Sequence, residues 1–147
     1  MGLVSFAAQS SPILVDTSFL VSVYDKREPC HRQCMAALAS VHRPLVTCEP
    51  VIAETIYHLQ RISGAPQAVL SNIQEGRLEI PFQLAEKASQ VLACYTKCAD
   101  TPCDLADACL IAMADQLGTG DILTLDSDFR HYRWRRNRRF NLLISLD

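Results

Sequence analysis

The sequence has no long hydrophobic run and contains little glycine or proline. No stretch approaches the roughly 20 consecutive apolar residues that cross a bilayer, so we expect no membrane contact. Only 5 of the 147 residues are glycine and 7 are proline, which excludes a collagen-like or low-complexity chain. Charged residues make up 20% of the chain and the net charge is −2, so the molecule as a whole is not a general polyanion binder.

The first residues also lack the features of an export signal. Residues 1–11 have neither a basic start nor an apolar core, so we expect a cytoplasmic protein. In that reducing compartment the seven cysteines should remain free thiols. Two pairs, Cys30 with Cys34 and Cys94 with Cys98, have a spacing that allows a zinc pair on one helix face. Burial in the core is the preferred interpretation, because cysteine is among the most buried residue types.

The residues that are present predict a single α/β domain. The length fits one domain, and 49% hydrophobic residues suffice for a core. We expect residues 1–11 to form a flexible leader and residues 12–147 to form the domain. Short apolar segments alternate with helical patterns, which predicts a three-layer α/β/α sandwich around a mostly parallel sheet. The expected strands are 13–15, 45–47, 78–80, 122–125 and 140–144, and the expected helices are 17–24, 29–41, 50–59, 66–76, 84–98, 105–118 and a short one after 126.

Acidic residues stand where a ligand site of such a sheet is expected. Ligands of open parallel sheets bind beyond the carboxyl ends of the strands. Asp16 follows the first strand and Asp126 follows strand 122–125, while Glu54 and Asp107 lie near the starts of two helices. Two carboxylates 4 Å apart repel by about 4 kcal/mol at an effective dielectric of 20, unless one is protonated or a cation lies between them. Oxygen ligands favour Mg²⁺ or Mn²⁺, and such ions promote attack of water at phosphorus.

Each of these acids has a structural alternative. Asp16 could start a turn, and Glu54 could lie on a solvated helix face. Asp104 is the expected helix N-cap, which leaves Asp107 as the ligand. Asp126 is preferred as a ligand over Asp128, which is either a secondary ligand or a charge favoured at a helix start.

Four segments resemble, in the same order, the motifs of PIN-domain proteins, the group that contains the VapC-type toxin ribonucleases. The segments are ILVDTS at 13–18, IAE at 52–54, PCDLADA at 102–108 and TLDSDF at 124–129. The resemblance runs from about Pro12 to Ile144. It implies an α/β/α sandwich, a Mg²⁺- or Mn²⁺-dependent endoribonuclease, and a homodimer held by an antitoxin protein. It places Asp16, Glu54, Asp107 and Asp126 at the acidic positions of the family, and Ser18 and Thr124 at polar positions that line the site and contact substrate.

An arginine-rich segment departs from this pattern. Six arginines lie between Arg130 and Arg139, which makes the link to the last strand longer and more basic than is usual in the family. We predict that the segment grips RNA phosphates while Tyr132 and Trp134 stack on bases. A solvated face and a contact with an acidic partner are the alternatives. The arginines predicted to bind substrate are Arg135, Arg136, Arg138 and Arg139.

The sequence therefore predicts a metal-dependent endoribonuclease, the toxin of a VapBC-type toxin–antitoxin pair. One alternative is a catalytically weak PIN-like module that binds RNA or protein. Another is a phosphatase with a nucleophilic aspartate after the first strand. That chemistry typically needs a second acid two residues later, where this chain has Ser18.

Overall fold

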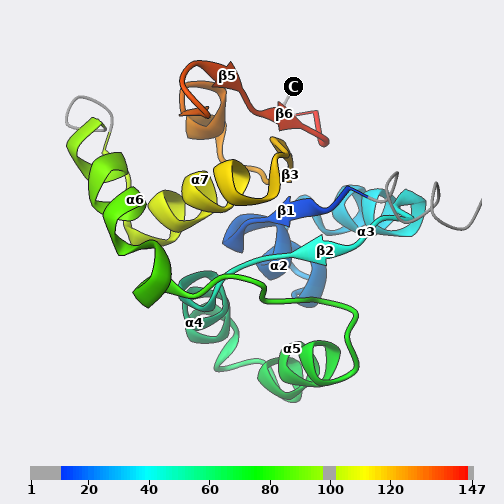
Figure 1. Ribbon diagram of the computed structural model, residues 1–147. Coiled ribbons are helices and arrows are strands. Elements are labelled where there is room, and N and C mark those ends of the chain that lie inside the picture. The colour runs from blue at the N-terminus through cyan, green and yellow to red at the C-terminus, as the bar shows by residue number, and fades with distance from the viewer. Residues whose placement is uncertain (1–10, 98–101, 146–147) are drawn as a thin grey trace, which may run out of the picture.

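A parallel four-stranded sheet lies at the centre of the computed structural model, which describes residues 11–97 and 102–145 (Figure 1). The strand order is β2–β1–β3–β6, and every neighbouring pair is parallel. All three residues of β1 are buried, as expected of an apolar strand that is covered on both faces. The strands are β1 (Ile13–Val15), β2 (Leu45–Val46), β3 (Asp121–Leu123) and β6 (Asn141–Leu142).

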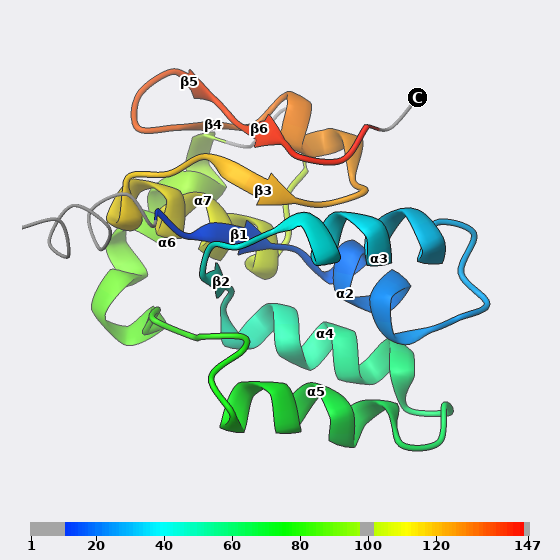
Figure 2. The ribbon, with the colours of Figure 1, turned by 90° about the vertical axis from the view of Figure 1, so that its right-hand side faces the viewer.

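Helices cover both faces of the sheet. Helices α6 and α7 lie on one side and α2 and α3 on the other, while α4 and α5 lie beyond the β2 edge (Figure 1, Figure 2). The predicted three-layer α/β/α sandwich with a parallel central sheet is therefore confirmed. The helices are α2 (Thr17–Tyr24), α3 (His31–Ser40), α4 (Glu49–Leu59), α5 (Ala65–Gln74), α6 (Leu84–Lys97) and α7 (Leu105–Leu117).

Helix α7 is the central helix of the core. Its sequence is apolar almost all round, and the run from Ala108 to Ala114 is entirely buried. The helix ends at Gly118, whose φ of 68° is left-handed, a conformation that glycine adopts without a steric penalty. Because α7 runs through the interior, it brings the acidic residues of its first turn to the end of the sheet.

Four of the five expected strands are shorter than predicted: β2 ends at Val46 and β3 at Leu123, and two further segments pair over even less of their expected length. Segment 78–80 forms only an isolated bridge between Val46 and Glu79. The backbone N–H of Glu79 donates to Leu45 at 2.9 Å, and its carbonyl accepts from Thr47 at 3.0 Å. Pro81 follows and has no N–H to continue the pairing. The expected strand 140–144 pairs with β3 over two residues only.

The arginine-rich segment folds into a 3-10 turn, η1 (Ser127–Arg130), and an antiparallel hairpin of β4 (Arg133–Trp134) and β5 (Arg138–Arg139). Sequence analysis did not predict the hairpin. Its turn places Arg135 and Arg136 at positive φ, where glycine or asparagine is the usual signal. The Trp134 ring packs so closely over Gly120 that a Cβ at that position would overlap the indole.

Several expectations fall on residues that the structure does not describe. The predicted leader falls almost entirely on residues 1–10, and Cys98 lies in the gap at residues 98–101, so the leader and the domain boundary stay predictions. Four of the described cysteines, Cys30, Cys34, Cys48 and Cys109, are free thiols, as expected. None of the described helices is both long and apolar enough to cross a membrane.

Candidate active site

Six carboxylates from separate parts of the chain line one cavity of about 350 Å³ at the carboxyl ends of β1 and β3. The structure thus brings together the four acids predicted from the sequence and adds two more, while Asp128 is not among the residues that line the cavity. The six are Asp16, Glu28, Glu54, Asp104, Asp107 and Asp126.

Asp16 is the most deeply buried of the six and is only 5% exposed. It directly follows β1 and caps α2, where its Oδ1 accepts from the backbone N–H of Thr17 at 2.8 Å. Its Oδ2 accepts from the hydroxyls of Thr124 at 2.7 Å and Ser18 at 3.3 Å. Burial raises the pKa of Asp16 despite these bonds, and repulsion by Asp126 adds to the rise.

Ser18 and Thr124 tie the ends of β1 and β3 together. The two hydroxyl oxygens lie 3.3 Å apart, and Ser18 Oγ accepts from the backbone N–H of Leu125 at 2.9 Å. The Thr124 hydroxyl also accepts from the N–H of Asp126 at 3.0 Å. Thr124 has no exposed surface, so the prediction that it contacts substrate is wrong. Its hydroxyl instead orients Asp16.

Glu54 is half-buried and lies in the second turn of α4. Its Oε1 accepts from the hydroxyl of Thr17 at 2.9 Å, which joins the start of α2 to α4. Burial raises the pKa of Glu54, and repulsion by Asp104 and Asp16 raises it further. The structure therefore does not support the alternative that Glu54 lies on a solvated helix face.

Asp104 and Asp107 form a capping box at the start of α7. Asp104 Oδ1 accepts from the N–H of Asp107 at 2.9 Å, which confirms the predicted N-cap. Asp107 Oδ2 accepts from the hydroxyl of Tyr132 at 3.1 Å. Burial, together with repulsion by Asp104 and Asp16, raises the pKa of Asp107 to about 7.

Asp126 and Asp128 share the start of η1. Asp126 is its N-cap, and Asp126 Oδ1 accepts from the backbone N–H of Asp128 at 2.9 Å. Asp126 faces the cavity, whereas Asp128 lies in the first turn of η1, which agrees with a charge favoured at a helix start.

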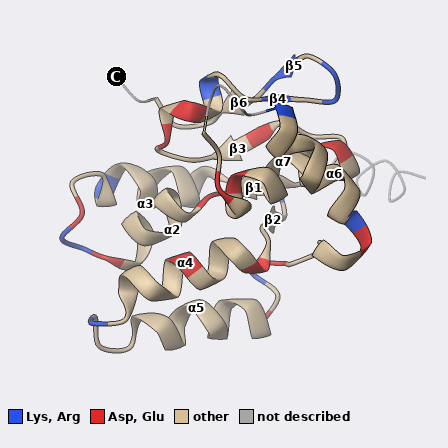
Figure 3. Cartoon of the chain, turned by 90° about the vertical axis from the view of Figure 1, so that its left-hand side faces the viewer, with Lys and Arg blue, Asp and Glu red and all other residues tan. Residues whose placement is uncertain are grey.

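The predicted RNA-binding arginines do not line the carboxylate cavity. The backbone N–H of Arg135 donates to Asp115, which lies eight residues, or about 12 Å, along α7 from Asp107. Figure 3 shows the basic segments of the β4–β5 hairpin together at one edge of the molecule, beside α7. Tyr132 and Trp134 are only 3% and 6% exposed, so the predicted stacking of bases on them is wrong.

Sequence analysis did not identify two side chains that orient the acids. Thr17 could have been found, because it directly follows Asp16 and begins α2. Tyr132 gave no such signal, since its contact with Asp107 spans 25 residues and depends on how η1 packs. His58 and Glu28 also line the cavity, and nothing in their sequence spacing indicated it.

The donor set fits a hard divalent cation. Every acid that lines the cavity offers carboxylate oxygens, the ligands that hard cations prefer. The raised pKa values of Asp16, Glu54 and Asp107 show that their charged forms are unfavourable in the folded chain. A bound cation would remove that cost. In the part of the chain that the structure describes, no three acidic, histidine or cysteine side chains close around a common point tightly enough to hold an ion.

Comparison with known proteins identifies relatives of this chain. The family model of the PIN domain matches residues 13–135. Ribonuclease VapC26 of Mycobacterium tuberculosis is 33% identical over 122 residues, which cover 82% of this chain and 89% of that protein.

A solved structure shares the fold as well. The crystal structure of Mycobacterium tuberculosis VapC20, a Sarcin-Ricin loop cleaving toxin, is similar at a TM-score of 0.72 and covers 79% of this chain and 91% of its own. At 21% identity this likeness shows the fold alone. The match of the family model over most of the chain and the identity to VapC26 together show that the protein belongs to the PIN domain family.

Proposed function

We propose that the protein is a VapC-type toxin endoribonuclease that uses Mg²⁺ or Mn²⁺. The observation that carries this proposal is the meeting of carboxylates from four separate elements in one cavity at the end of a parallel sheet. The identity to a ribonuclease over most of the chain supports RNA as the substrate. When bound, a divalent ion activates water and stabilises the charge that develops at phosphorus.

In this proposal Asp16, Glu54, Asp107 and Asp126 hold the ion, and the surrounding hydroxyls fix where their oxygens point. Thr124 and Ser18 donate to Asp16, so its two oxygens keep one orientation relative to the end of β3. Ser18 is half-buried beside the cavity and is the hydroxyl of this pair that can reach a substrate phosphate.

Two further hydroxyl groups donate to carboxylates on the other sides of the site. Thr17 donates to Glu54 and holds α4 against α2. Tyr132 donates to Asp107, and burial raises the pKa of Tyr132 above its ordinary value, so the hydroxyl remains a donor at neutral pH. These contacts support an arrangement that is formed before RNA binds, which is the condition for electrostatic stabilisation without reorganisation.

The test is cleavage of total RNA and of synthetic RNA with Mg²⁺, with Mn²⁺ and with EDTA. We expect wild type to cut RNA with a divalent ion and not with EDTA. Asp16→Asn should lose cleavage, whereas Glu86→Gln, which changes an exposed carboxylate on α6, should keep it. RNA binding without cleavage by wild type in every ion would contradict the proposal and support the weak binding module.

We also propose an antitoxin partner, a homodimer and a cytoplasmic location, all on the strength of the relationship to VapC26. Size-exclusion chromatography with light scattering measures the oligomeric state. A short neighbouring reading frame that encodes a protein able to bind this chain and stop its RNA cleavage would establish the antitoxin. If co-expression of that neighbour left cleavage unchanged, the toxin–antitoxin assignment would fail.

A further inference from the structure

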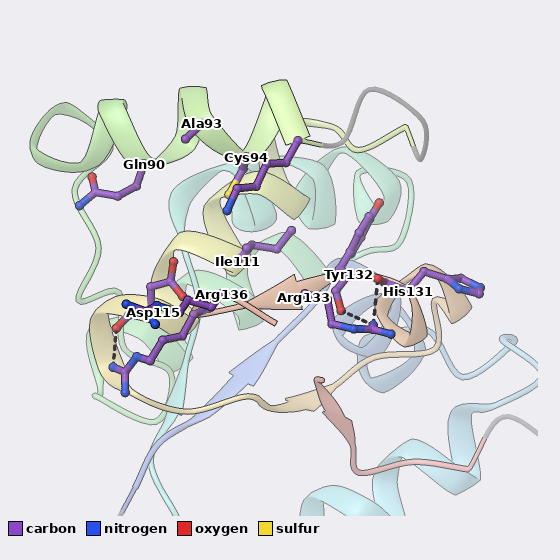
Figure 4. Close-up of a pocket in the computed structure, with 11 residues that line it drawn as sticks. Gln90, Ala93, Cys94, Ile111, Asp115, His131, Tyr132, Arg133 and Arg136 are labelled. Atoms are coloured by element: carbon purple, nitrogen blue, oxygen red, sulfur yellow. Dashed lines mark hydrogen bonds between the residues drawn. The ribbon is translucent and has the colours of Figure 1, made fainter. Parts of the chain in front are cut away.

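A second cavity, of about 310 Å³, lies between α6, α7 and the β4–β5 hairpin (Figure 4). Gln90 and Cys94 of α6 form one wall, and Ile111 of α7 lies across from them. Tyr132 stands at one end of the cavity, and Asp115 with Arg136 stands at the other. We call it the hairpin cavity.

The hairpin cavity adjoins the carboxylate cavity through one side chain. Tyr132 lines the hairpin cavity, and its hydroxyl donates to Asp107, which lines the carboxylate cavity. The two cavities also share α7, since Asp107, Ile111 and Asp115 follow one another at four-residue intervals and so lie along one side of that helix. The two cavities are therefore neighbours along one side of α7.

The lining of the hairpin cavity is strongly basic. Lys97, Arg133, Arg135 and Arg136 contribute four cations, against one carboxylate, Asp115. That carboxylate already accepts from the backbone N–H of Arg135. Within residues 11–97 and 102–145, none of the four cations forms an ion pair.

Two of these cations have structural tasks and two do not. The Arg133 guanidinium donates to the carbonyls of Arg130, His131 and Tyr132, and Arg135 donates to the carbonyl of Asp115 at 3.1 Å. Lys97 and Arg136 are exposed and make no hydrogen bond or ion pair that the described residues show. They remain available for an anion.

The backbone of the hairpin turn is also held in a costly conformation. Arg135 and Arg136 have φ values of 37° and 68°, a region that disfavours side chains other than glycine, asparagine and aspartate. The Asp115 carboxylate accepts from the backbone N–H of Arg135 and so holds the first of these two residues in place. Backbone strain that surrounding contacts maintain in this way is typical of ligand-binding segments. The turn thus keeps two arginines at the cavity where a glycine would form the same turn without strain.

We infer that the hairpin cavity is a backbone subsite that binds RNA phosphates a few nucleotides away from the bond that is cut; the inference rests on the proposed function. Asp107 and Asp115 are about 12 Å apart along α7. At a stacked rise of about 3.4 Å per nucleotide, this corresponds to three or four nucleotides. RNA is favoured over an acidic protein segment because the basic lining continues from the carboxylates that would act on a phosphodiester.

The test compares two double variants that each remove two exposed cations. Lys97→Ala with Arg136→Ala changes the hairpin cavity, and Arg32→Ala with Arg61→Ala changes α3 and the α4–α5 turn instead. The substrate is a 20-nucleotide single-stranded RNA centred on a bond that wild type is found to cut. We expect the cavity variant to raise KM roughly tenfold with kcat unchanged, and the control variant to match wild type. The slope of log KM against log salt should fall by up to about 1.4, since each single-strand phosphate contact contributes about 0.7.

Shortening the RNA locates the contact. Removing nucleotides on one side, up to the third or fourth from the cut bond, should raise the KM of wild type to that of the cavity variant. The same shortening should leave the cavity variant unchanged. Thermal melts of both double variants should match wild type, because the substituted side chains are exposed.

Two outcomes would overturn the inference while RNA cleavage by wild type upholds the proposed function. An unchanged KM in the cavity variant would do so and would leave the cavity for an acidic protein segment. An equal rise in KM in the control variant would indicate a diffuse basic surface. If wild type cuts no RNA, the proposed function itself fails and the inference fails with it.

Discussion

Asp107 shows how burial and neighbouring charge act on one carboxyl group. It is half-buried in the first turn of α7, close to Asp104 and Asp16, and its pKa is raised to about 7. The hydrogen bonds that it accepts oppose this rise but do not cancel it. Near neutral pH the metal-free protein is therefore a mixture of protonated and charged forms at this position.

The raised pKa predicts that the metal-free protein is less stable at pH 8 than at pH 5. Asp107 binds a proton more tightly in the folded state than in the unfolded chain, where its pKa is 3.8. Its contribution to stability is thus complete below about pH 4 and is lost as pH rises through 7. A pKa unit corresponds to about 1.4 kcal/mol, and solvent screening of a half-buried group reduces the total to roughly 2 kcal/mol.

Urea unfolding in EDTA at pH 5 and pH 8 measures this loss. Asp107→Asn should reduce the difference between the two pH values, because the amide does not titrate. A smaller dependence should remain, since burial raises the pKa of Asp16 and Glu54 in the same direction. Glu86→Gln is the control. A wild-type protein that is more stable at pH 8 than at pH 5 would contradict the prediction.

Tyr132 is predicted to act by positioning Asp107. Its hydroxyl lies 3.1 Å from Asp107 Oδ2 and 3.0 Å from the carbonyl of Pro102, while its ring packs edge-on against Phe129. Tyr132→Phe keeps the ring and removes the hydrogen bond, so we expect a loss of about 1 kcal/mol of stability. Cleavage should show a lower kcat and need more Mg²⁺, with KM for RNA unchanged.

The exposed Tyr57 on α4 provides the control for that experiment, and Tyr57→Phe should match wild type. A Tyr132→Phe protein with normal kcat and a normal Mg²⁺ requirement would show that the hydroxyl only supports the fold.

At the scale of elements, the capping box of α7 combines a structural and a chemical task. Asp104 caps the helix through the N–H of Asp107, and its charge helps to raise the pKa of Asp107. Asp104→Ala should cost about 0.5–2 kcal/mol of unfolding free energy and keep measurable metal-dependent cleavage. Asp104→Asn should restore most of the stability, because asparagine caps helices as well as aspartate does.

Chemical denaturation and a cleavage assay on these two variants separate the two tasks. If Asp104→Ala left stability unchanged but abolished cleavage, the assignment of cap to Asp104 and ligand to Asp107 would have to be exchanged.

Local patterns in the sequence sufficed to predict most elements but not the hairpin. Strand β1 is apolar throughout, and α2 and α7 begin at capping aspartates, so their positions follow from neighbouring residues alone. The β4–β5 turn instead uses arginines at positive φ, held by Asp115 twenty residues away in the sequence. Such a turn depends on tertiary contact, which a local pattern does not contain.

At the scale of the molecule, the position of the acids was predictable because parallel strands end at a common edge. Asp16 and Asp126 each follow a strand, so topology alone brings them to one place. Which polar and aromatic side chains are buried was not predictable in the same way. Thr124 lies completely inside because Ser18 and Asp16 close over it, and the aromatic residues of the arginine-rich segment turn inward onto α7 and Gly120.

The whole fold is also predicted to be linked to metal binding through the repulsion among its acids. Added Mg²⁺ should stabilise wild type, because an ion that binds only the folded state contributes about 2.7 kcal/mol at one hundred times its Kd. Asp126→Asn removes one negative charge beside Asp16, and the amide oxygen can still accept from the N–H of Asp128. In EDTA this variant should therefore be as stable as wild type or more stable.

With Mg²⁺ the order of stability should reverse, so that wild type is more stable than Asp126→Asn. Asp126→Asn should lose much of the stabilisation that the ion gives wild type, and its RNA cleavage should collapse because one carboxylate of the proposed ligand set is gone. Thermal melts of both proteins in EDTA and in Mg²⁺, together with a cleavage assay, measure each part. Carboxylates with a purely structural role require the opposite pattern: a lower melting temperature in EDTA, no response to the ion, and cleavage that falls only as far as unfolding requires. An Asp126→Asn protein that melts well below wild type in EDTA yet cuts RNA normally with Mg²⁺ would remove Asp126 from the metal site.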